Sequence, residues 1–226
     1  KEVFRLKYIS AGPLATPELS VGLALDEIIH FAKISKNGAI YAKRAINDAG
    51  TDKFEALREK LVKYEEIADR IEYEIATFLN ALSQQSISDD TRAKVKAMYK
   101  IIGELESLGD SGESISRILT RRNSHEQKFS DEQKTRIKNM LEAVDKAYGV
   151  MIDNLKAEIF EPMGLRMATD CEIEINELRN NIREEEIFKL EKGETKYHSS
   201  VYYLDTISEI ERMGDYIINI SQALDK

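Results

Sequence analysis

A seven-residue acidic segment occurs twice in the chain, and this repetition constrains the fold more than any other feature of the sequence. Residues 104–110, Glu-Leu-Glu-Ser-Leu-Gly-Asp, return 105 positions later as residues 209–215, Glu-Ile-Glu-Arg-Met-Gly-Asp. Three positions of another segment return at an offset of 107, where Glu65, Asp69 and Ile75 become Glu172, Asn176 and Ile182. Similarity at a fixed spacing indicates a structural unit that is used more than once. We therefore expect two halves with the same fold.

Apolar residues recur at spacings of three and four over most of the sequence, which is the pattern of amphipathic helices. The chain has only 11 glycines and 3 prolines, so it can form few turns and must consist of long elements. Helix starts are predicted by Pro17 after Thr16, by a capping pair of Asp52 and Glu55, and by a capping box of Ser130 and Gln133. The predicted helices cover about 19–48, 52–82, 89–122, 130–160 (stopped by Pro162 and Gly164), a fifth up to 190, and 195–224.

Long helices joined by short connections pack side by side as antiparallel bundles. The predicted fold class is therefore all-α, with six long helices in bundles and no sheet. The repeat divides these helices into two units of three, residues 17–122 and residues 130–226.

Composition excludes several classes of function. A net charge of −8 and a pI near 5.2 argue against a nucleic-acid partner, because phosphate backbones are bound by clustered Lys and Arg. No apolar run approaches the roughly 18 to 20 residues that span a bilayer, and the first residues do not resemble a secretion signal. A single cysteine, Cys171, is consistent with a reducing compartment such as the cytoplasm. Because the sequence begins at Lys1 without an initiator Met, we expect it to be part of a longer protein.

The repeated segments place carboxylates in pairs on one helical face. Residues four apart share a face, so Glu106 with Asp110, and Glu211 with Asp215, point the same way. A neighbouring helix can add Glu65 and Asp69 in the first repeat, or Glu172 and Asn176 in the second. Carboxylate oxygens are preferred ligands of hard cations, so two similar sites for Mg²⁺, Mn²⁺, iron or Zn²⁺ are predicted. The alternative is that such pairs arise on solvated faces of a chain with 41 acidic residues.

Catalytic motifs are missing from the sequence. Glu27 and His30 form one Glu-x-x-His element, whereas di-iron carboxylate bundles require two such elements. No glycine-rich phosphate loop and no Gly-x-Ser-x-Gly segment is present, so no nucleophile can be named and the chain is not expected to be an enzyme. The basic pairs Arg121–Arg122 and Lys96–Lys100 are expected to be solvated.

At the repeated acidic segments the sequence resembles the PhoU family of phosphate-uptake regulators. Residues 209–216 are close to the family's motif, and residues 65–75 and 172–182 fit its other helix motif, within a resemblance that extends from about 17 to 224. The resemblance implies two pseudo-symmetric three-helix bundles, with metal ions or clusters bound at Glu65, Asp69, Glu106, Asp110, Glu172, Asn176, Glu211 and Asp215. Asn176 stands where the family has an acid and Ser107 where it usually has Arg, so the two sites are expected to differ in occupancy.

The opening segment carries a narrower resemblance. From Tyr8 to Glu18, and at Glu27, it is similar to the stretch that joins the membrane domain of bacterial sodium/phosphate cotransporter proteins to their C-terminal PhoU-like domain. Residues 1–16 are therefore expected to be a linker from a membrane transporter domain of the same chain, at the cytoplasmic face of the inner membrane. A free-standing adaptor acting on a separate transporter and sensor kinase, and a carboxylate-bridged metal enzyme, are the alternatives. Homo-oligomerisation is left open.

Overall fold

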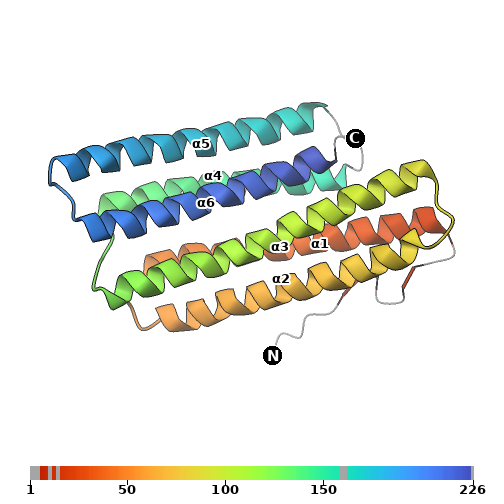
Figure 1. Cartoon of the computed structure of the whole chain (residues 1–226), viewed down its shortest axis with the longest axis horizontal. Helices are drawn as coiled ribbons and strands as arrows, with labels where there is room; N and C mark the ends of the chain where they lie inside the picture. The colour runs from red at the N-terminus through yellow and green to blue at the C-terminus, as the bar shows by residue number, and fades with distance from the viewer. Residues whose placement is uncertain (1–5, 10–11, 14–15, 158–161, 225–226) are drawn as a thin grey trace.

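The protein is described by a computed structural model that covers residues 6–9, 12–13, 16–157 and 162–224. In this part of the chain, regular structure consists of six α-helices and includes no strand (Figure 1). The helices are α1 (Pro17–Asp48), α2 (Phe54–Ser83), α3 (Asp89–Ser124), α4 (Asp131–Lys156), α5 (Pro162–Glu191) and α6 (Tyr197–Ala223). The predicted all-α fold is thus confirmed. None of the described helices has an apolar stretch long enough to cross a membrane.

The helix boundaries confirm some sequence signals and correct others. Ser130 and Gln133 form the predicted capping box, in which each side chain accepts a hydrogen bond from the other residue's backbone N–H. The predicted capping pair of Asp52 and Glu55 is wrong, because α2 is preceded by Lys53 and has no side-chain cap.

Pro162 and Gly164 were expected to stop the fourth helix, and this expectation is also wrong. The helix α4 already ends at Lys156, and Pro162 is the first residue of α5, where a missing N–H costs no hydrogen bond. The predicted end near Phe160 lies outside the described residues.

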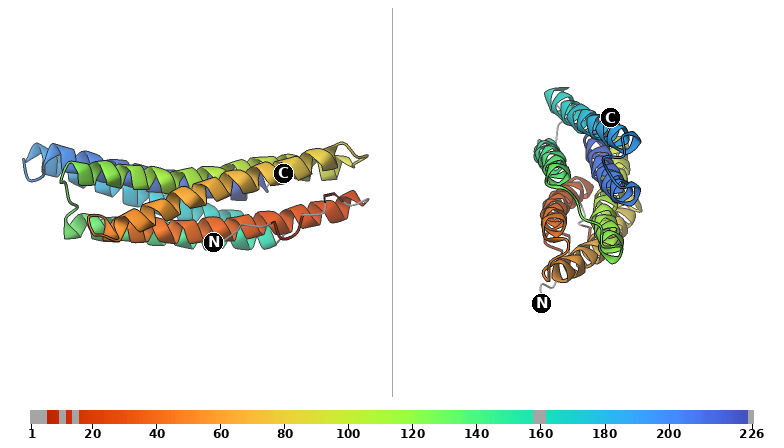
Figure 2. Two further views of the ribbon diagram at one scale, coloured as in Figure 1. Left: turned by 90° about the horizontal axis from the view of Figure 1, so that it is seen from below. Right: turned by 90° about the vertical axis from the view of Figure 1, so that its left-hand side faces the viewer.

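The helices pack in two groups of three that share one core. In the first group α1, α2 and α3 contact one another, in the second α4, α5 and α6 do so, and the groups meet through α3 with α6 and α1 with α4. Viewed end-on, α2 and α5 lie at opposite edges and the other four helices lie between them (Figure 2). The two acidic segments of α3 and α6 therefore belong to adjacent, central helices.

The glycine of each acidic segment marks a close approach of two helices. A Cβ added to Gly109 would lie 2.8 Å from Ala68 Cβ on α2, and one added to Gly214 would lie 3.0 Å from Ile175 Cδ1 on α5. Ala68 and Ile175 are themselves 107 positions apart, the offset found in the sequence. Close helix packing therefore accounts for a glycine at both positions, and the matched contacts support the register of the repeat.

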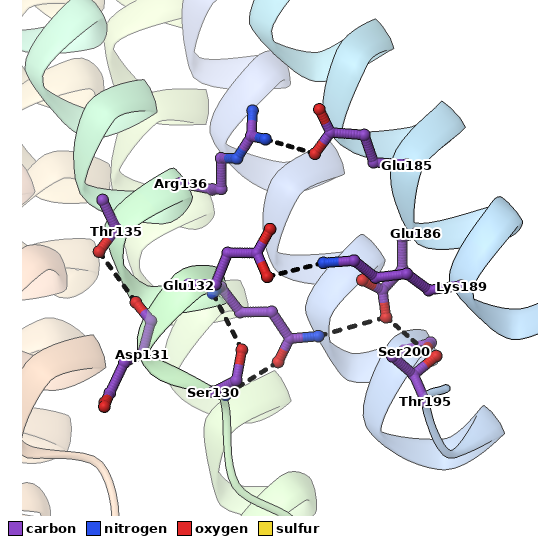
Figure 3. Close-up of polar contacts among 11 residues, drawn as sticks. Ser130, Asp131, Glu132, Thr135, Arg136, Glu185, Glu186, Lys189, Thr195 and Ser200 are labelled. Carbon is purple, nitrogen blue, oxygen red and sulfur yellow. Dashed lines mark hydrogen bonds and ion pairs between the residues drawn. The ribbon is translucent and has the colours of Figure 1, made fainter. Parts of the chain in front are cut away.

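A buried carboxylate joins all three helices of the second repeat near one end (Figure 3). Glu186 on α5 is only 3% exposed, and its Oε1 accepts hydrogen bonds from Gln133 Nε2 on α4 (3.2 Å) and from Ser200 Oγ on α6 (2.5 Å). Because Ser200 is fully buried and Gln133 nearly so, Glu186 is the acceptor for two donors that water does not readily reach, although Ser200 Oγ also lies 3.0 Å from Thr195 Oγ1.

Replacing Glu186 with Ala is expected to destabilise the protein by about 2 to 3 kcal/mol, because two buried donors lose their acceptor and a small cavity forms. Chemical denaturation monitored by circular dichroism measures this. Its matched control is Glu185→Ala on the next residue, whose ion pair with Arg136 is solvent-exposed and is worth less than about 1 kcal/mol. Equal losses in the two variants would contradict the assignment of Glu186 as the residue that joins the three helices.

Candidate metal centre

Three predicted ligands of the first repeat converge in the structure. Glu65 and Asp69 lie one turn apart on α2 and face Asp110 on α3 across the contact made by Gly109. Each of the three carboxylates offers one oxygen, and these oxygens all lie within 4.8 Å of one another. We refer to Glu65, Asp69 and Asp110 as the acidic triad.

Glu106, the fourth predicted ligand of this repeat, lies beside the acidic triad but is not one of the three converging groups. Burial, followed by the charges of Asp110 and Asp69, raises its pKa from its ordinary value to about 7. The pKa of Glu65 is raised by burial and by Asp69, Glu113 and Asp110. The charged neighbours that raise these two pKa values are all carboxylates, so negative charge is concentrated where α2 and α3 meet.

Such a donor set fits a hard cation. Three carboxylate oxygens from two helices, with Glu106 at hand as a further ligand, match the oxygen-rich coordination that Mg²⁺, Mn²⁺ and iron accept. A bound cation would oppose the rise in the pKa of Glu106 that burial and the neighbouring carboxylates cause. Metal binding itself stays a prediction, but the predicted meeting of the α2 and α3 carboxylates is found.

The predicted ligands of the second repeat are arranged differently. Among residues 16–157 and 162–224 no second group of three carboxylates meets the distances of the acidic triad. Burial, followed by the charge of the nearby Asp215, raises the pKa of Glu172. Glu211, however, accepts a hydrogen bond from Arg179 Nη1 at 3.0 Å. Asn176 Oδ1 is buried, and the described structure provides it with no hydrogen-bond partner.

Arg179 is the functional residue that the sequence interpretation missed. It lies on α5, seven residues after Glu172, and its side chain is only 24% exposed. A signal for it was present, because the offset of 107 matches Arg179 to Glu72, so a basic residue stands where the first repeat has an acidic one.

Glu27, half of the Glu-x-x-His element, binds backbone in the described structure. It is fully buried, and its Oε2 accepts hydrogen bonds from the backbone N–H groups of Lys7 (2.9 Å) and Tyr8 (2.6 Å). The ring of His30 makes an edge contact with that of Tyr8. These contacts hold the segment before α1 against the helix, a structural role consistent with the expectation that this element is no di-iron site.

Arg122 was expected to be solvated, and this expectation is wrong. Its side chain is 2% exposed, lies over the ring of Phe129 at 4.5 Å and donates to Asn123 Oδ1 at 2.7 Å. The helical rotation of 100° per residue explains the difference, because adjacent residues point to different sides of α3. Arg121, on the other side, is exposed as expected.

The raised pKa of Glu106 predicts a pH-dependent stability of the metal-free protein. The folded state holds this proton up to about pH 7, whereas the unfolded chain releases it near 4.5. Between these values the folded state binds more protons, so the free energy of unfolding falls as pH rises from about 5 to 7. Melting curves in chelator at pH 5, 6, 7 and 8 measure this fall. Glu106→Gln should reduce the slope, and an unchanged slope would count against the assignment.

Comparisons with known proteins agree with this architecture. Residues 137–224, which make up most of the second repeat, match the family model of the PhoU domain. The structure is similar to that of the phosphate transport system regulatory protein PhoU from Streptococcus pneumoniae, with a TM-score of 0.78 at 17% identity over 92% of this chain and 95% of that one. It is also similar to PhoU from Pseudomonas aeruginosa, with a TM-score of 0.81 at 12% identity over 92% and 97% of the two chains. At these identities the likeness establishes the fold. No curated protein matches the sequence.

Proposed function

We propose that this chain, which has the PhoU fold over its length and a PhoU domain in its second half, regulates phosphate transport. The observation that carries the proposal is the match of residues 137–224 to the PhoU domain. The similar structure from Streptococcus pneumoniae is named as a regulatory protein of a phosphate transport system. The acidic triad adds a place at which a metal ion can change the state of the protein.

Metal binding at the acidic triad would act on shape through the helix contacts. Asp110 lies on α3, and α3 packs both against α2, which carries Glu65 and Asp69, and against α6 of the second repeat. Neutralising the triad removes repulsion between α2 and α3 and favours the close packing of these two helices. Because α3 contacts both α2 and α6, a change in the packing of α2 against α3 also affects the contact between the two repeats.

The finer proposal is that the chain is the cytoplasmic PhoU-like domain of a sodium-dependent phosphate transporter. Its support is the resemblance of the segment from Tyr8 to Glu18 to the linker of such proteins. A free-standing PhoU-type adaptor is the alternative, and it would have the same fold and the same acidic triad. The coding sequence upstream of Lys1 distinguishes the two proposals, since membrane-spanning segments there support the first and their absence supports the second.

The test of the regulatory function is phosphate uptake in the bacterium that encodes the protein. Uptake of radiolabelled phosphate is compared, at low and high external phosphate, between the wild type, a strain lacking residues 17–224, and a strain carrying D69N/D110N. Both altered strains are expected to change uptake in the same direction, with the substituted protein present at its normal level. Uptake that is the same in all three strains at both concentrations would refute a role in phosphate transport.

A further inference from the structure

We propose that Arg179 is a built-in cation of the second repeat, which neutralises its acidic cluster and excludes metal there, so that only the first repeat binds metal. This inference deepens the proposed function and rests on the metal site of the first repeat for its comparison. It departs from the expectation of two metal sites.

The contact between Arg179 and Glu211 is the first observation. Arg179 Nη1 lies 3.0 Å from Glu211 Oε1, and the two side chains are only 24% and 16% exposed, so water screens the pair poorly. The guanidinium thus joins α5 to α6, as a metal ion would join the corresponding helices of the first repeat. The charge of Arg179 also opposes the rise in the pKa of Glu211 and of Asp215.

The second observation is a change of charge at three positions of the two clusters. Three positions around the clusters differ in the same sense, since Asp69, Glu72 and Ser107 correspond to Asn176, Arg179 and Arg212. Each change makes the second repeat less negative, by four charges in all. Arg212 and Arg183 act on Glu211 as Arg179 does, whereas carboxylates surround Glu65 and Glu106.

The third observation concerns the ligands that remain. Glu211 is occupied by Arg179, and Asn176 brings no charge, so Glu172 and Asp215 are the two anionic groups left for a cation. Asn176 Oδ1 and Arg179 Nε are buried without partners in the described structure. They are an acceptor and a donor one helical turn apart, so a small rotation can satisfy both without an ion. A metal ion entering here would meet the guanidinium at close range and be repelled.

The two repeats therefore have different roles. In the second repeat the Arg179 side chain holds α5 and α6 together, whatever the metal concentration. The first repeat gains the corresponding neutralisation only when a metal ion is bound. A metal signal then changes one side of the α3 and α6 contact while the other side stays constant.

The decisive measurement is Mn²⁺ binding in the D69N/D110N background, where the first repeat is disabled. The wild-type protein is expected to bind Mn²⁺ and the D69N/D110N protein to bind none, by equilibrium dialysis and elemental analysis. Adding N176D/R179E to the disabled protein gives the second repeat the first repeat's residues at two of the three positions that differ in charge and should restore Mn²⁺ binding. A matched control, N180D/R166E, makes the same change of charge at exposed positions of α5 and should restore nothing.

Two results overturn the inference. One is Mn²⁺ that stays bound to the D69N/D110N protein and is lost on Asp215→Asn, which would make the second repeat a metal site as it stands. The other is a folded N176D/R179E protein that binds no more Mn²⁺ than its parent. Both differ from failure of the proposed metal site, which would appear as a wild type that binds no Mn²⁺.

A thermal melt in chelator tests Arg179 without any metal. Arg179→Met should lower the melting temperature by about 4 °C, because Glu211 loses its partner. Adding Glu211→Gln should recover a large part of this loss, because the unpaired charge is removed. Losses that simply add in the double variant would overturn the inference.

Discussion

Replacing Asp69 and Asp110 together with asparagine is expected to abolish metal binding, lowering affinity for Mn²⁺ by more than about 100-fold. The acidic triad contains three carboxylates within 4.8 Å, and the double variant keeps only Glu65 of these three, with Glu106 beside it. Asparagine keeps the size and an oxygen ligand but removes the charge that attracts the cation. Titration calorimetry with Mn²⁺ measures the loss.

The same variant separates loss of metal from loss of fold. At a metal concentration of 100 times the dissociation constant, the wild type gains about 2.7 kcal/mol of stability, and the variant should gain none. In chelator the variant should be as stable as the wild type or more so, since it lacks two of the carboxylate charges that, after burial, raise the pKa of Glu65 and Glu106.

The matched control for this prediction is E177Q/E184Q on α5. It also removes two negative charges, but at exposed positions outside the acidic triad. Metal-dependent stabilisation should persist in the control. Equal metal binding by the wild type and D69N/D110N would show that the triad is not the site.

Replacing Gly109 with Leu is expected to destabilise the protein by about 3 kcal/mol and to weaken metal binding as well. Even a Cβ at this position would lie 2.8 Å from Ala68 Cβ and 3.7 Å from Glu65 Cα. A leucine must therefore push α2 away from α3, which moves Glu65 and Asp69 away from Asp110. Denaturant unfolding and Mn²⁺ titration measure the two effects.

Two controls isolate the contact. Gly103→Leu changes a glycine of the same helix that has nothing within 4 Å of its added Cβ, so it should be neutral or slightly stabilising. Ala68→Gly removes the carbon atom that a Cβ at 109 would strike, so it should recover part of the stability lost in Gly109→Ala. If Gly109→Leu unfolds no more easily than Gly103→Leu, the close approach of α2 and α3 is not a constraint on position 109.

The sequence was sufficient to predict what depends on a single helix or on repetition. Helical spacing of apolar residues predicted the six helices, and the capping box at Ser130 placed the start of α4. The offset of 107 was found at Glu65, Asp69 and Ile75, and the packing of Ala68 and Ile175 against Gly109 and Gly214 follows the same offset. These features are local, because 3.6 residues per turn and a hydrogen-bonded first turn depend on near neighbours in the chain.

Two wrong predictions show what the local sequence does not determine. Pro162 was interpreted as the end of one helix, although it begins the next, and a proline is compatible with both positions. Arg122 was placed in solvent beside Arg121, although it is buried over Phe129. Whether a charged side chain is buried depends on what covers that side of the helix. The residues next to it in the sequence do not determine this.

The composition of the two acidic clusters was decided only by the tertiary structure. The spacing of four placed Glu106 with Asp110, and Glu211 with Asp215, on shared helical faces. It could not predict which residues of another helix lie beside each face. The fold brings Glu65 and Asp69 to Asp110, and it brings Arg179 to Glu211. The physical reason is that helical periodicity fixes directions within one helix, whereas contacts between helices depend on their rotation and separation, which the whole core sets.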